Sequence, residues 1–106
     1  MRRRHQVSQV LESPAMALCR RVGVMRRRGQ HRRALLMLRN AAYTDENDAK
    51  LWTLYGAACA RMGRRDAARQ AWGHAVWLRD RDRDPVRADV TRGLIDGLDV
   101  SVDQTG

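Results

Sequence analysis

The stretch MGRRDAARQAWGHA, from Met62 to Ala75, repeats the spacing of RRGQHRRALLMLRNA, residues 27–41, at a period of 34 residues. Four positions recur at the same offsets. They are Gly29, Ala34, Leu38 and Ala41 in the first copy and Gly63, Ala68, Trp72 and Ala75 in the second. A fixed period of tens of residues indicates structural units that stack on one another. The spacing therefore predicts two copies of one structural unit.

Each copy contains two helical patterns separated by a glycine, which commonly ends a helix. In the second copy, the first stripe of apolar residues holds Trp52, Tyr55, Cys59 and Met62, and the next holds Ala68, Ala71, Trp72, Ala75 and Leu78. The first copy gives Leu18, Val22 and Met25 before Gly29. Two helices approach closely only where side chains are small, and large rings fill the space beside them. Gly56, Ala68 and Ala75 supply the small positions of such a helical hairpin.

These residues resemble the tetratricopeptide repeat, whose unit of 34 residues is a helix–turn–helix. The signature positions are Trp52, Tyr55, Gly56, Ala68, Trp72 and Ala75. Residues 49–82 follow the signature well, although Asp80 stands where the family has Pro. Residues 14–48 form a degenerate copy, with Leu18, Arg21 and Val22 at the positions of Trp, Leu and Gly. The resemblance implies an all-α fold, in which antiparallel hairpins stack as a short α-solenoid of about six helices.

The flanking segments are predicted to cap the two copies. Residues 1–13 form a basic segment with a short helix around Val7, Val10 and Leu11, and Ser13-Pro14 is typical of a helix start. Residues 83–100 form a capping helix that begins at Asp84-Pro85, and residues 101–106 form a disordered tail. The stripe expected to be buried in that helix is Val86, Val90, Leu94 and Leu98. The run RDRDRD, residues 79–84, predicts a salt-bridged junction.

The charge of the chain is strongly asymmetric. The whole chain carries a net charge of +9, but residues 1–42 hold eleven arginines against Glu12 alone. This distribution favours an acidic partner, which could be nucleic acid, an anionic membrane or an acidic protein segment. A genome rich in G and C is an alternative explanation, because 20 of the 21 basic residues are Arg. The chain lacks a membrane-length apolar run and a signal-like core, so we expect a cytoplasmic protein without a membrane span.

The sequence offers no set of convergent polar groups for catalysis. His5, His31 and His74 are scattered, and no phosphate-binding glycine loop is present. Cys19 and Cys59 lie 40 residues apart without metal-ligand spacing, so both are expected to be reduced thiols. We therefore expect no enzyme activity, no metal site and no cofactor.

A binding surface remains as the functional prediction. In the resembled family, the first helices of successive repeats line a concave groove that holds a segment of a partner protein. Carried onto this chain, the groove residues are Met16, Cys19, Gly23, Arg26, Arg27, Lys50, Thr53, Ala57, Ala60, Arg61, Arg87, Thr91 and Leu94. The groove has a small apolar centre and a basic rim. The resemblance thus implies an adaptor, scaffold or small chaperone that binds an acidic or amphipathic segment of another protein.

Two alternatives to this function remain open. Arg28, Arg32, Arg33, Arg64 and Arg65 surround the two turns inside the repeats, and a basic edge of this kind could contact the phosphates of a nucleic acid. Base stacking needs exposed aromatic rings, but Trp77 is expected to pack on the last helix.

The second alternative is self-assembly, in which the short array buries its open ends in a homodimer.

Overall fold

The computed structural model describes the chain from Ser13 to Thr105, and the side chains of that range up to Asp99. Within this range the fold is all-α. Its helices are α2 (Pro14–Arg27), α3 (His31–Thr44), α4 (Ala49–Arg61), α5 (Arg65–Arg81) and α6 (Pro85–Thr105). Five helices are therefore present, against about six expected. The remaining one was predicted around Val7, Val10 and Leu11, which lie outside the described residues.

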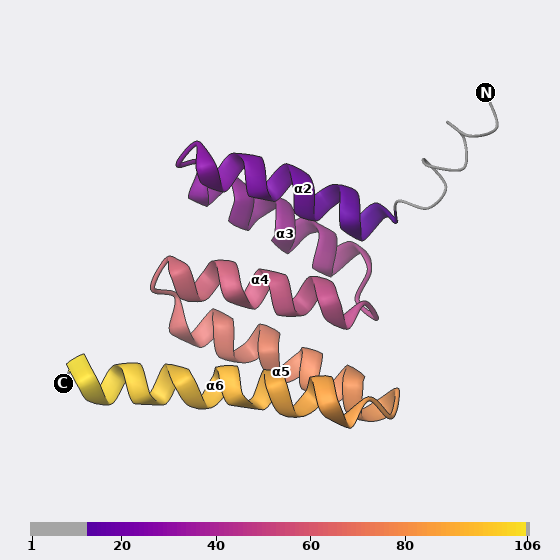
Figure 1. Cartoon of the computed structure of the whole chain (residues 1–106), viewed down its shortest axis with the longest axis vertical. Coiled ribbons are helices and arrows are strands. Elements are labelled where there is room, and N and C mark those ends of the chain that lie inside the picture. Colours follow the sequence, from indigo (N-terminus) through magenta and orange to yellow (C-terminus); the bar gives the residue numbers. More distant parts are fainter. Residues whose placement is uncertain (1–12, 106) are drawn as a thin grey trace.

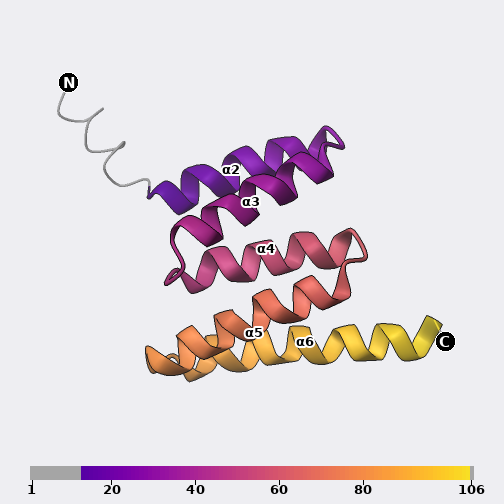
Figure 2. The same ribbon diagram turned by 180° about the vertical axis from the view of Figure 1, so that it is seen from behind.

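The helices follow one another as an antiparallel series, and each packs against the next one in the chain (Figure 1). Figures 1 and 2 together show α2, α4 and α6 toward one face of the molecule and α3 and α5 toward the other. The α2–α3 and α4–α5 turns lie at one edge, and the α3–α4 and α5–α6 connections lie at the opposite edge. Residues separated by one repeat are thus brought to the same side.

The helix ends follow the sequence signals. Ser13 Oγ accepts a hydrogen bond from Met16 N at 3.1 Å, and Pro14 occupies the first turn of α2. Gly29 and Gly63 end the first helix of each hairpin with positive φ angles of 76° and 75°, which glycine adopts without steric cost. The α5–α6 turn instead places Arg83 at φ 57°, so no glycine marks this turn in the sequence.

The core alternates small and large residues, as the repeat spacing predicts. Ala68, Trp72 and Ala75 of α5 are buried against α4. A Cβ atom added to Gly56 would lie 2.4 Å from the Trp72 ring, so only glycine fits at this crossing. Trp72 Nε1 also donates a hydrogen bond to the Thr53 carbonyl oxygen at 2.9 Å. This contact fixes the distance between the two helices of the second hairpin.

The packing of α6 differs from the prediction. Val86 and Val90 are 72% and 62% exposed, Leu94 is 39% exposed, and only Leu98 of the predicted stripe is buried. The buried face consists instead of Ala88, Thr91, Ile95 and Leu98. The prediction failed because the face of α6 that packs on α5 holds a small residue, Ala88, and a polar one, Thr91. Burial of Thr91 is possible because its hydroxyl donates a hydrogen bond to the Arg87 carbonyl oxygen at 2.8 Å. The helix also continues to Thr105, past residue 100 where a disordered tail was expected.

Two other burial predictions were wrong. Trp77 was expected to pack on the last helix, but it is 57% exposed, stacked on His74 and covered by the Arg81 guanidinium at 5.4 Å. Met62 was assigned to the buried stripe of α4, but it is the C-cap residue and is 37% exposed. Trp77 and Met62 therefore both lie at the surface of the stacked helices.

The RDRDRD junction is confirmed as a network of ion pairs. Arg81 binds Asp82 at 3.2 Å, and Arg87 of α6 binds Asp84 at 3.0 Å. Asp80 at the end of α5 pairs with Arg92 of α6. The Asp80–Arg92 pair therefore links α5 to α6, and the other two pairs are local to the junction.

Candidate partner-binding surface

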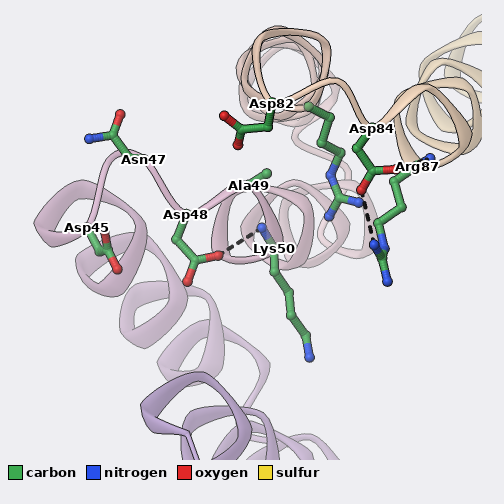
Figure 3. Close-up of a pocket in the computed structure, with 9 residues that line it drawn as sticks. Asp45, Asn47, Asp48, Ala49, Lys50, Asp82, Asp84 and Arg87 are labelled. Atoms are coloured by element: carbon green, nitrogen blue, oxygen red, sulfur yellow. Dashed lines mark hydrogen bonds and ion pairs between the residues drawn. The ribbon is translucent and has the colours of Figure 1, made fainter.

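A recess of about 520 Å³ lies at the edge that holds the α3–α4 and α5–α6 connections. Three cationic residues come to it from three helices: Lys50 from the first turn of α4, Arg79 from the last turn of α5 and Arg87 from the first turn of α6. Figure 3 shows the Lys50 and Arg87 side chains extending toward the same side of the recess. The remaining lining residues are Asp45, Asn47, Asp48, Ala49, Asp82 and Asp84.

Two of the carboxylates in this recess serve as helix caps. Asp48 Oδ1 accepts hydrogen bonds from Lys50 N at 3.0 Å and Leu51 N at 3.2 Å, which satisfies the start of α4. Asp84 accepts from Arg87 N at 3.3 Å and from Arg87 Nη1 at 3.0 Å. The side-chain hydrogen bond from Arg87 is the main reason that the pKa of Asp84 lies below its ordinary value. These two carboxylates are therefore held by the first turns of α4 and α6.

Arg79 was missed by the sequence analysis, yet it is the least satisfied residue of the recess. Its Nη2 atom lies 3.5 Å from Thr53 Oγ1, and its Nε atom is buried without a hydrogen-bond partner among the described residues. The Lys50 ammonium likewise makes no ion pair within the described range. In the sequence, Arg79 was marked only by its place in RDRDRD. That pattern predicted an ion pair, not a buried donor without an acceptor.

The α4 face next to the recess is made of small side chains. Thr53, Ala57 and Ala60 are half-buried along this helix. On α2, Cys19 is half-buried and Met16 is 52% exposed. One groove residue was wrongly assigned: Thr91 is 2% exposed, because it faces α5, and it cannot line a surface. On α6 the exposed members of the predicted set are Arg87 and Leu94.

The other end of the predicted groove is basic. Arg26 and Arg27 lie exposed at the end of α2, and Arg61 lies exposed at the end of α4. Partial burial and the neighbouring positive charge of Arg26 both lower the pKa of Arg61. The Arg26 charge at the end of α2 is therefore near enough to act on Arg61 at the end of α4.

The arginines predicted to form a basic edge also lie together. Arg28, Arg32 and Arg33 flank the α2–α3 turn, and Arg64 and Arg65 flank the α4–α5 turn. Both turns are on the same edge of the molecule (Figure 2). All of these side chains are exposed except Arg65, which is half-buried.

The described residues contain no group of three or more His, Cys, Asp and Glu that could hold a metal ion. Cys19 and Cys59 are both free thiols. Burial is the main reason that the pKa of Cys59 lies above its ordinary value.

No helix between residues 13 and 105 is both long and apolar enough to cross a bilayer. Neither the protein-family models nor the curated proteins nor the solved structures contain a match to this chain.

Proposed function

We propose that this chain is a non-enzymatic protein-binding module of the tetratricopeptide class. Its hairpins would form a short α-solenoid, and the face made by α2, α4 and α6 would hold an acidic or amphipathic segment of a partner protein. The 34-residue period and the contact between Gly56 and Trp72 support this assignment to a class. Stacked hairpins of this kind present an extended surface for binding.

The observation that carries the proposal is the meeting of three cationic side chains, Lys50, Arg79 and Arg87, at one recess. Lys50 and Arg87 are exposed there, and the Lys50 ammonium has no carboxylate bound to it within the described residues. A carboxylate from a partner would pair with these exposed groups, and bonds between ions are stronger than neutral ones.

The α4 face explains why the partner segment should also carry apolar side chains. Thr53, Ala57 and Ala60 are half-buried on this face of α4, and none of them has a long side chain. Met16 adds an exposed and adaptable apolar surface on the α2 side. A segment with apolar anchors along this face and an acidic residue at the recess would satisfy both features.

The proposal is tested by affinity purification of the tagged chain from its own cells at moderate salt, with nuclease treatment of a parallel sample. We expect a stoichiometric protein partner that survives nuclease and is reduced at least about tenfold by the variant Lys50→Glu/Arg87→Glu, because this variant places negative charges opposite the acidic segment and such like-charge contacts are strongly unfavourable. The control variant Arg32→Glu/Arg64→Glu changes the net charge equally at the other edge. It should retain the partner. Equal loss in both variants, or no nuclease-resistant partner, would contradict the proposal.

A further inference from the structure

The edge that holds the α2–α3 and α4–α5 turns carries eight arginines. They are the five arginines of the predicted basic edge, Arg28, Arg32, Arg33, Arg64 and Arg65, together with Arg26, Arg27 and Arg61, which also lie at the basic end of the predicted groove. The name basic edge covers all eight from here on. Within the described range none of them forms an ion pair with a carboxylate. By contrast, Arg69, Arg81, Arg87 and Arg92 all have carboxylate partners. The arginines of this basic edge therefore lack carboxylate partners within the described range, whereas four arginines elsewhere on α5 and α6 are paired.

The local backbone adds to the positive potential at the same edge. The helices α3 and α5 begin there, and their N-cap residues, Gln30 and Arg64, make no side-chain capping bond. The starts of α2, α4 and α6 are instead capped by Ser13, Asp48 and Asp84. A helix start carries partial positive charge and favours anions. The first turn of α5 contains Asp66, but that of α3 has no acidic residue, so Arg32 and Arg33 face an uncompensated helix start. A polyanion would relieve the repulsion between these arginines and the backbone.

The surroundings of the basic edge indicate which polyanion fits. Among the exposed large hydrophobic residues between Ser13 and Asp99, only Met62 lies at this edge. The exposed rings of Tyr43 and Trp77 lie near the opposite ends of α3 and α5. A protein segment would find little apolar surface to bury here, and a single-stranded nucleic acid would find no ring for base stacking. A double helix needs neither, because its phosphates are bound by charge and hydrogen bonds alone.

We propose that the basic edge binds the phosphate backbone of double-helical nucleic acid without reading its base sequence. Arginine suits this role, since its guanidinium donates two parallel hydrogen bonds to a phosphate. If the edge neutralises about four to six phosphates, the logarithm of the binding constant falls with the logarithm of salt with a slope of about −4 to −5. The dissociation constant would then rise on the order of 10² to 10³-fold between about 50 and 200 mM salt.

The test is fluorescence anisotropy with two labelled duplexes of about 20 base pairs and unrelated sequence, across this salt range. The purified full chain should bind both duplexes equally and with the steep salt slope. The variant Arg32→Glu/Arg64→Glu should weaken binding more than about tenfold and flatten the slope by about two. Lys50→Glu/Arg87→Glu lowers the net charge by the same amount away from the basic edge. It should change binding less than about threefold, because exposed charges beyond a Debye length are screened.

Three results would overturn this inference. Equal weakening by the two variants would show that only the net charge of the chain matters. Absence of salt-dependent duplex binding by the wild-type chain would remove the site altogether. Binding of a polyglutamate peptide or of anionic lipid vesicles as tightly as the duplex, at the same salt, would assign the edge to a different partner. Circular dichroism of each variant verifies that it is folded. Nuclease-resistant capture of a partner protein through the groove is measured in a separate experiment. The duplex-binding proposal and the protein-binding proposal can therefore each fail without the other.

Discussion

Replacement of Gly56 by alanine would test the repeated packing unit at its closest contact. An added Cβ atom would lie 2.4 Å from Trp72 Cδ1 and 2.5 Å from Trp72 Nε1, whereas ordinary contacts begin at 3.4 Å. The Trp72 ring would therefore have to move by about 1 Å. Trp72 is 5% exposed, and its Nε1 bond to the Thr53 carbonyl oxygen holds the ring against the same helix, α4. The ring cannot move without losing both packing and this hydrogen bond.

The size of the effect follows from three contributions. Overpacking a buried site costs about 1–3 kcal/mol. Leaving the Trp72 donor or its acceptor unpaired costs about 1–3 kcal/mol more. The gain in helix propensity from glycine to alanine offsets about 1 kcal/mol. We therefore expect Gly56→Ala to lower the free energy of unfolding by about 1–5 kcal/mol.

The matched control is Gly73→Ala on α5, where an added Cβ atom meets nothing within 4 Å. This control should raise the free energy of unfolding by about 0.5–1 kcal/mol, because only backbone entropy and helix propensity change. Urea unfolding, followed by circular dichroism, measures both variants. If Gly56→Ala were as stable as Gly73→Ala, the close approach of α4 and α5 would not exist in solution and the packing argument would be wrong.

Two further predictions concern individual side chains. The pKa of Asp84 lies below its ordinary value in the folded chain, so ionised Asp84 contributes stability above its unfolded pKa, and this is lost as pH falls through the folded pKa. Carboxyl NMR titration should show the low pKa, and Arg87→Ala should raise it toward its ordinary value; an unchanged pKa would reject the hydrogen bond as its cause. Cys59 is fully buried with a raised pKa, so a thiol reagent at pH 8 should modify Cys19 first and Cys59 only on unfolding. Equal modification rates for both thiols would contradict the buried position of Cys59.

The second hairpin could be predicted closely from the sequence because its constraints are local. Trp52, Tyr55 and Cys59 recur at helical spacing and are buried together. Gly63 marks a turn that only a positive φ angle can make, and such residues are conspicuous in a sequence. Helix starts at Ser13 and Asp84 were equally visible, since a capping side chain must stand at a fixed offset from the backbone groups it satisfies.

The last helix and the recess could not be predicted in the same way. Helical spacing shows which apolar residues of α6 share one face. It does not show that Ala88 and Thr91 are buried while Val86 and Val90 face outward, because that depends on the shape of α5. Arg79 in the recess depends on the meeting of three helices. In a run of alternating charges, the sequence does not show whether an arginine pairs with a neighbouring Asp or with a group from outside the chain.

The central claim is that the face formed by α2, α4 and α6 holds a partner protein. Hydrogen–deuterium exchange of the chain alone and bound to the protein recovered after nuclease treatment tests this most directly. We predict slower exchange in the first halves of α4 and α6, around Lys50 and Arg87, where amides would be covered and their helices held in place. Slower exchange confined to α3 and α5, with α4 and α6 unchanged, would contradict the account, because the partner would then occupy the opposite face.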